Sequence, residues 1–273
     1  MNDVLTEAAL YLHRLGYDRP PPPTLATLRE LQQRHTATFP FETISSLLRL
    51  PVPIDLPTVQ HKLLHAGRGG YCYELNRIFL ALLQELGFDA RGLTARVVMG
   101  GPEDALTART HLLVLVVLDG ERHVADVGFG GMVPTAPLRL DTEDPQATPH
   151  EPYRITRHDG RYTLRALVGG EWRAMYVFDL QPQAEIDYIV GNWYVGTHPD
   201  SSFLGQLRVA RTGPGWRRTL NNGSFAIHRI GQASERFDLP DADAVIAVLR
   251  DEFGIRVPAH PDLQVAIDAR LVG

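Results

Sequence analysis

The stretch "RTHLLVLVVLDGERHVADVGFGG" (residues 109–131) decides the fold, because it is typical of two apolar strands joined by a tight turn. The segment before the turn, 111–118, is rich in Leu and Val, and "RHVADVGF" (122–129) follows the turn. Asp119-Gly120 is a favoured sequence for a two-residue hairpin turn. The stretch therefore predicts an antiparallel β-hairpin.

The register of this hairpin brings two chemically useful side chains together. A two-residue turn pairs Leu118 with Glu121 and, further along, places His111 opposite Gly128. Asp126 is then the diagonal neighbour of His111 on the same face, at roughly 7–8 Å between backbones and within side-chain reach. A glycine opposite His111 leaves this face open for a third group. Asp126 lies in an otherwise apolar strand, so it needs a partner if it is buried.

The third group is indicated by "RGGYCYEL" (residues 68–75), which contains Cys72, the one cysteine among 273 residues. From Cys72 the sequence predicts a helix that ends at Gly87, with an apolar stripe at Leu75, Ile78, Phe79, Leu82, Leu83 and Leu86. A thiol is nucleophilic as its thiolate, and a helix N-terminus stabilises that anion. Gly69 and Gly70 are expected to let the backbone turn tightly before the cysteine. The alternative is a buried and inert thiol.

Cys72, His111 and Asp126 together fit the logic of a nucleophile, a base and a group that orients the base. The alternative for the last two is a purely structural His–Asp pair. His61 and His65 have the i, i+4 spacing of a zinc site, but Lys62 stands where the H-E-x-x-H motif has its Glu, so we expect two surface histidines and no metal. His123 points away from His111 by strand parity and is expected to be exposed.

Composition excludes several classes of protein. The net charge of −5 and a pI near 6.1 do not favour a nucleic-acid binder. The apolar run 112–118 is far too short to cross a membrane, and the acidic residues near the N-terminus do not fit an export signal. A single cysteine rules out an internal disulfide and fits a reducing cytoplasm, so we expect a cytoplasmic protein without membrane contact.

Outside the hairpin, the pattern divides the chain into thirds. The first third is mainly helical, with expected helices at 24–35, around "LPTVQHKLLHAG" (56–67), and from Cys72. The middle third is predicted to be an antiparallel meander or small barrel, with turns at 158–160 and 169–170. The last third mixes expected helices at 184–195 and 241–253 with strands around Leu207 and Phe225. The fold class is therefore mixed α+β.

Several motifs, taken in order, resemble the arylamine N-acetyltransferases. They are "FPFE" (39–42), "RGGYCYE" (68–74), "RTH" (109–111), "DVGFGG" (126–131) and "GNWYVGTHPDSSF" (191–203). The resemblance covers almost the whole chain, and the set of motifs is specific although each one alone is weak. Thr43 departs from the family pattern, which usually has Asn after P-F-E, and this puts the polar contacts around Glu42 in doubt.

The resemblance implies three lobes on a cysteine-protease or transglutaminase-like catalytic core. These are a helical bundle (1–88) that carries Cys72, a β-barrel (89–183) that carries His111 and Asp126, and an α/β lid (184–273). It implies acetyl transfer from acetyl-CoA to arylamines, hydrazines or arylhydroxylamines, by a ping-pong route through an acetyl-cysteine, as in xenobiotic metabolism. Acetyl-CoA is then a substrate, and no cofactor is bound permanently.

The resemblance also assigns roles to residues around this Cys-His-Asp triad. Residues implied to contact coenzyme A are Thr110, Gly128, Phe129, Gly130 and Gly131. Residues implied to line the acceptor pocket are Phe41, Val98, Phe129 and Phe203. Arg68 and Glu42 are implied to form a buried ion pair that braces the cysteine loop. For each of these the alternative is ordinary: a simple turn, core packing, or two solvated charges.

Three other functions stay open at this point. One is an amide synthase of the same family that closes macrocycles in a larger cleft. Another is a cysteine hydrolase or transglutaminase-like enzyme that passes the acyl group to water or lysine. The last is a non-catalytic binding module with an unreactive thiol. The expected partners are small molecules, and a homodimer is one assembly state that the resemblance allows.

Overall fold

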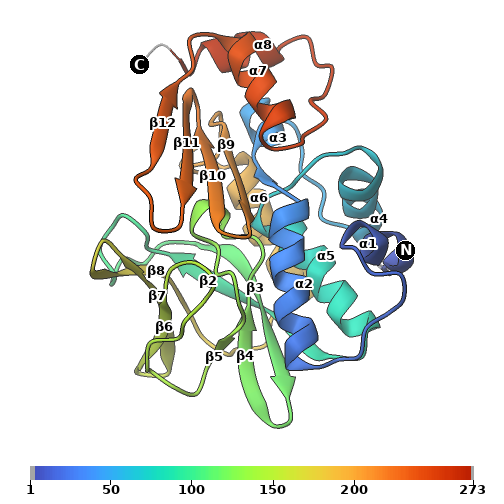
Figure 1. Ribbon diagram of the computed structural model, residues 1–273, viewed down its shortest axis with the longest axis vertical. Coiled ribbons are helices and arrows are strands. Elements are labelled where there is room, and N and C mark those ends of the chain that lie inside the picture. The colour runs from blue at the N-terminus through green and yellow to red at the C-terminus, as the bar shows by residue number, and fades with distance from the viewer. Residues whose placement is uncertain (1–3, 272–273) are drawn as a thin grey trace.

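The computed structural model describes residues 4–271 and contains three groups of elements, as Figure 1 shows. Helices occupy most of the first third of the chain. They are α1 (Ala8–Arg14), α2 (Leu25–Thr38), α3 (Ile44–Leu47), α4 (Leu56–Gln60), a π-helix (His61–His65) and α5 (Cys72–Glu85). The expected stripe of α5 is buried from Leu75 to Leu83, and Gly87 follows with a positive φ of 84° that ends the helix.

The middle third forms a seven-stranded antiparallel sheet in the order β5-β4-β3-β2-β8-β7-β6. The edge strands β5 and β6 contact each other, so the sheet closes almost completely into a barrel. Its strands are β2 (Asp89–Val97), β3 (Arg109–Leu118), β4 (Glu121–Ala125), β5 (Leu138–Arg139), β6 (Tyr153–His158), β7 (Arg161–Val168) and β8 (Glu171–Phe178). The helix α5 packs across β2 and β3, which brings the first lobe against the barrel.

The predicted hairpin is confirmed at its turn, but the strand pairing at its far end differs from the prediction. Leu118 pairs with Glu121, and both turn residues have the positive φ values of a type I′ turn, 51° and 81°. The ladder stops at the pair Val114–Ala125, so the expected pairing of His111 with Gly128 does not form. The reason is that the Asp126 carboxylate binds the Gly128 N–H (2.9 Å), which turns the chain toward α5.

His123 is buried, with 2 % of its side chain exposed, so the expectation of an exposed histidine was wrong. Strand parity was correct: His123 pairs with Val116, on the face opposite His111. That face is covered, because Val114 and Val116 belong to the same apolar cluster as the residues of α2 and α5. The other face fills the barrel interior.

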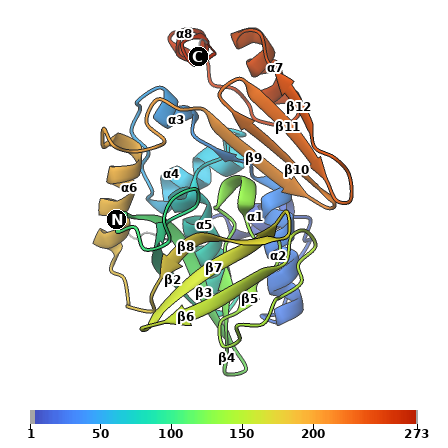
Figure 2. The ribbon, with the colours of Figure 1, turned by 90° about the vertical axis from the view of Figure 1, so that its left-hand side faces the viewer.

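The last third begins with α6 (Glu185–Thr197), continues into a five-stranded antiparallel sheet and ends with two helices. The later elements are β9 (Arg208–Gly213), β10 (Trp216–Asn221), β11 (Ser224–Arg229), β12 (Glu235–Asp238), α7 (Ala242–Asp251) and α8 (Leu263–Asp268). The edge strand β1 (Phe41–Glu42) comes from the first third and pairs with β9. Figure 2 shows this sheet and α7 above the barrel on the right of the view, with α6 on the left. The ladder between β1 and β9 therefore links the first and last thirds of the chain.

Candidate active site

Cys72 is the first residue of α5, where the sequence placed it. Tyr71 is the N-cap, and its backbone N–H donates to the Glu74 carboxylate (3.1 Å). The Cys72 side chain is buried, and its Sγ donates to the backbone oxygen of Thr110 on β3 (3.5 Å). The start of the helix thus fixes the thiol against the barrel.

Gly69 and Gly70 serve close approach and not a tight turn, because neither has a positive φ. A Cβ on Gly69 would lie 2.0 Å from the Pro40 backbone oxygen, and a Cβ on Gly70 would lie 2.8 Å from Cβ of Glu74. The Gly70 N–H donates to Pro40, and the Gly70 carbonyl accepts from the Glu42 N–H (3.0 Å). The glycines therefore let the cysteine loop lie directly on β1.

His111 and Asp126 form a buried pair, with Nε2 of the ring 2.7 Å from Oδ2 of the carboxylate. Cys72 lines the same cleft as this imidazole and is one of the groups that raise its pKa. A Cβ on Gly128 would lie 2.7 Å from Cα of Cys72, so the missing side chain leaves the room that the cysteine occupies. The structure thus brings together the three residues that the sequence selected.

Two further residues, which sequence reasoning missed, hold Asp126. Asn76 Nδ2 donates to Oδ1 of Asp126 (2.9 Å), and the Tyr176 hydroxyl donates to Oδ2 (3.1 Å). Asn76 also donates to the Leu112 carbonyl (2.6 Å) and accepts from the Val127 N–H (3.0 Å). A polar residue one turn after Cys72 in a buried helix was an available signal for Asn76. Tyr176 lies on β8, and no sequence pattern linked that strand to the site.

The electrostatics of the pair favour a charged imidazole. Burial alone would lower the pKa of His111, but the Asp126 carboxylate and the hydrogen bonds to Asp126 and Cys72 raise it to about 10. Burial would raise the pKa of Asp126, but the His111 charge and the hydrogen bonds from Asn76 and Gly128 hold it below its usual value. At neutral pH the pair is therefore imidazolium and carboxylate.

The expected ion pair between Arg68 and Glu42 is present and belongs to a larger cluster. Arg68 Nη2 lies 2.7 Å from Oε1 of Glu42, whose side chain is fully buried. Lys62 contacts both Glu42 (3.7 Å) and Glu74 (2.6 Å), so two buried acids share two cations beneath the cysteine loop. Burial opposes ionisation of Glu42, yet Lys62, Arg68 and the Ile44 N–H lower its pKa.

Glu42→Gln is expected to destabilise the protein by roughly 3–5 kcal/mol, because it leaves two partly buried cations short of a buried carboxylate. The measurement is the free energy of unfolding in urea. Glu171→Gln is the matched control, since its pair with Arg173 is largely exposed and is expected to contribute less than about 1 kcal/mol. Equal, small losses for both variants would contradict a bracing role for the cluster.

A cleft of about 770 Å³ opens above the triad, between the barrel and the last third of the chain. Of the residues expected to bind substrates, those that line this cleft are Phe41, Thr110, Gly128, Phe129, Gly130, Gly131 and Phe203. Val98 is buried and lies outside the lining, whereas its neighbours Val97 and Met99 are part of it. Val98 comes directly after the end of β2, and its backbone N–H donates to the Met175 carbonyl on β8. Residue type alone therefore did not fix the direction of its side chain.

Aromatic rings occupy both sides of this cleft. Phe129 makes an edge contact with His111, with ring centroids 5.0 Å apart. Phe41 and Phe203 make a similar edge contact at 5.8 Å, and Phe203 also contacts Tyr71 at 6.0 Å. A flat apolar group that enters the cleft therefore meets ring faces and edges close to the thiol.

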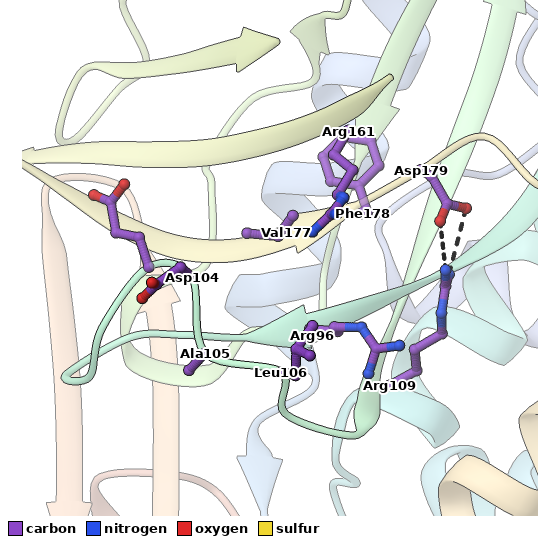
Figure 3. A pocket seen from close by; sticks show the side chains of 10 residues that line it. Arg96, Asp104, Ala105, Leu106, Arg109, Arg161, Val177, Phe178 and Asp179 are labelled. Carbon is purple, nitrogen blue, oxygen red and sulfur yellow. Dashed lines mark hydrogen bonds and ion pairs between the residues drawn. The ribbon is translucent and has the colours of Figure 1, made fainter. Parts of the chain in front are cut away.

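A second pocket, of about 200 Å³, lies at the edge of the barrel and is lined by charged residues. Figure 3 shows that Arg109 is paired there with Asp179, and Arg96 donates to the Thr107 carbonyl. Glu103 is paired with Arg165. Glu103, Arg109 and Asp179 of this pocket thus have ion-pair partners, and its lining contains no thiol or hydroxyl nucleophile, so the larger cleft is the candidate site.

Within residues 4–271, no group of three His, Cys, Asp or Glu side chains is arranged to bind a metal ion. His61 and His65 are exposed, and His65 pairs with Glu7 (2.6 Å). In the same described part of the chain, no helix has both the length and the apolar character needed to cross a bilayer.

A buried thiol at a helix start, an imidazole in the same cleft and a carboxylate paired with the imidazole are typical of cysteine-dependent acyl-transfer enzymes. Comparison with known proteins narrows this class. A family model described as N-acetyltransferase matches residues 24–261. The chain is 42 % identical to an arylamine N-acetyltransferase of Mycolicibacterium smegmatis over 249 residues, 90 % of either chain.

Two further relatives agree. An arylamine N-acetyltransferase of Escherichia coli is 40 % identical over 248 residues, which are 90 % of this chain and 88 % of the relative. The solved structure of the Mycobacterium marinum arylamine N-acetyltransferase in complex with CoA superposes with a TM-score of 0.89 at 40 % identity, covering 97 % of this chain and 98 % of that one. The chain therefore belongs to the arylamine N-acetyltransferase family.

Proposed function

We propose that this protein transfers the acetyl group of acetyl-CoA to the nitrogen of arylamines, hydrazines or arylhydroxylamines, through an acetyl-cysteine at Cys72. The observation that carries the proposal is that Cys72 and His111, which is paired with Asp126, line the same aromatic cleft. Family membership and the relative solved with CoA support the choice of donor.

In the first half-reaction, the Cys72 thiol gives its proton to His111, and the Cys72 sulfur attacks the carbonyl carbon of the acetyl thioester. The carbon–sulfur bond to coenzyme A breaks, and the leaving thiolate takes the proton held by His111. The products are free coenzyme A and acetyl-Cys72. A thioester is exchanged for a thioester, so a cysteine suits this step.

In the second half-reaction, the amine nitrogen attacks the acetyl-cysteine carbonyl. His111 accepts the proton that the nitrogen loses, the carbon–sulfur bond to Cys72 breaks, and the amide leaves. Asp126 stays ionised throughout and stabilises the imidazolium. Both substrates use the same thiol in turn, so coenzyme A departs before the amine reacts.

The coenzyme is proposed to lie along Thr110 and the Gly128–Gly131 segment. Gly130 has a positive φ of 67°, and a Cβ on Gly131 would lie 3.0 Å from Cγ2 of Thr219. Gly128, Gly130 and Gly131 have no side chains that would keep a pyrophosphate away from this backbone. The acceptor ring is proposed to lie near Phe41, Phe129 and Phe203.

Phe203→Ala is expected to weaken arylamine turnover roughly 10-fold while leaving acetylation of the enzyme by acetyl-CoA nearly unchanged. The ring contacts Phe41 and Tyr71, so its loss removes packing from the acceptor slot, and an aromatic contact contributes about 0.5–1.5 kcal/mol beyond area burial. Single-turnover kinetics of each half-reaction measure the two effects. An equal loss in both half-reactions would contradict an acceptor role for Phe203.

A panel of acyl-CoA donors and amines tests the function as a whole. Acetyl-CoA consumption that requires an arylamine supports the proposal. Release of the acyl group to water without an amine would favour a cysteine hydrolase, and exclusive use of large carrier-bound acyl chains would favour an amide synthase. We propose a cytoplasmic location, since a reducing compartment keeps the single thiol free. The homodimer remains a prediction, which size-exclusion chromatography tests.

A further inference from the structure

The strand β9 directs an arginine into the catalytic cleft. Side chains on a strand alternate between its faces. Leu207 and Val209 are buried in the apolar cluster that includes α7 and α8, and Ala210 belongs to the cluster that includes Cys72. Arg208 therefore lies on the cleft face together with Ala210, and it is among the residues that line the cleft.

The position of Arg208 is fixed at its backbone and at its side chain. Its backbone N–H donates to the Thr43 hydroxyl (2.9 Å), which also donates to the Gln206 carbonyl (2.7 Å). Thr43, the departure from the family motif, thus ties the start of β9 to the segment after β1. The guanidinium carbon of Arg208 lies 5.5 Å from the centre of the Phe203 ring, which itself contacts Phe41.

The Arg208 guanidinium has no acidic partner within the described chain. Its Nε atom is buried without a hydrogen bond, and burial lowers its pKa without any opposing carboxylate. The neighbouring Arg217 shows the contrast, since it donates to Glu151 (2.6 Å) and to the Val133 carbonyl (2.9 Å). A half-buried, unpaired cation is costly, and an incoming anion would offset that cost.

The side chains near Arg208 in the cleft do not prevent an incoming anion from pairing with it. Asp200 also lines the cleft, but its side chain is 83 % exposed, and the contact it makes is with His198 (3.9 Å). Asn221 is the cross-strand neighbour of Arg208 and lines the cleft too. An amide beside a guanidinium adds a second donor for an anionic group.

We propose that Arg208 determines acceptor specificity by pairing with a carboxylate carried on the aromatic ring of the amine. The proposal rests on the proposed function and adds to it one residue that determines specificity for acceptors with a ring carboxylate. Arg208 lies over Phe203, in the slot proposed for the acceptor ring, whereas the coenzyme phosphates are assigned to the Gly128–Gly131 segment. An acceptor whose ring packs on Phe203 would therefore bring a ring carboxylate to the guanidinium.

The test compares para-aminobenzoate with its uncharged analogue para-aminobenzamide, using wild type, Arg208→Gln and Arg208→Lys. For Arg208→Gln, kcat/KM is expected to fall between about 10-fold and about 100-fold with the carboxylate, and less than about 3-fold with the amide. Arg208→Lys is expected to recover part of the loss, because it keeps the charge without the bidentate geometry. Arg250→Gln, an exposed arginine on α7 outside the cleft, is the matched control.

Separate measurement of the two half-reactions distinguishes the two anions that Arg208 could bind, the ring carboxylate and the coenzyme phosphates. Burst acetylation of Cys72 by acetyl-CoA is expected to be unchanged in Arg208→Gln, and only deacetylation by the aminobenzoate is expected to slow. Slower acetylation would assign Arg208 to the coenzyme phosphates and overturn the proposal, as would equal losses with both amines. A wild-type protein that acetylates neither amine, although Cys72 accepts the acetyl group, would overturn the proposed function itself.

Discussion

Asp126→Asn is expected to give a folded protein whose acetyl transfer is slower by roughly 10⁴-fold. Oδ2 of Asp126 accepts from both His111 and Tyr176. An amide NH₂ in this place would donate to Nε2 of His111 and leave the proton on Nδ1, the nitrogen that remains for the Cys72 thiol. The imidazole would then be the wrong tautomer to accept the thiol proton. The measurement is kcat/KM with acetyl-CoA and an arylamine, alongside circular dichroism.

Tyr176→Phe is the matched control for this prediction. It removes one hydrogen bond from the same oxygen of Asp126 but keeps the carboxylate and its charge. The loss is expected to be about 10-fold, the range of a single hydrogen bond to a charged group. If Asp126→Asn were no slower than Tyr176→Phe, Asp126 would have a structural role only.

Cys72→Ala is expected to lower acetyl transfer on the order of 10⁶-fold, to the uncatalysed background. The variant lacks the atom that attacks the thioester, and no second cysteine exists in the chain to replace it. The fold is expected to persist, because Cβ still fills the space left by Gly128. The measurements are coenzyme A release with an arylamine present and a thermal melt.

A Cys72→Ala protein that retained a tenth of the wild-type rate would contradict covalent catalysis. It would favour direct transfer between two bound substrates, with His111 as the base. Binding of acetyl-CoA to the variant, measured by calorimetry, is the control that separates lost chemistry from a lost donor site.

Local sequence signals predicted the hairpin and α5. The Asp119-Gly120 turn fixes the register of β3 and β4, and this register predicts that His111 and Asp126 share one face. The i, i+3, i+4 stripe after Cys72 predicted the helix that presents the thiol. Turn chemistry and side-chain periodicity are local, so one sequence suffices to find them.

Contacts between distant segments could not be predicted in this way. The Phe41–Glu42 strand pairs with β9, a ladder between segments that are distant in the sequence, and nothing in either segment identifies its partner. For the same reason, the sequence did not show that Lys62 and Glu74 join the Arg68–Glu42 pair. His123 was assigned to the correct face of its strand, but the helices that cover this face come from elsewhere in the chain.

The mass of the intact protein after mixing with acetyl-CoA alone tests the central claim most directly. The account predicts one added acetyl group, located on the peptide that contains Cys72 and removed when an arylamine is added. Double-reciprocal plots at several acceptor concentrations are then parallel, because coenzyme A leaves before the amine reacts. An unmodified Cys72 together with intersecting plots would contradict the acetyl-cysteine route.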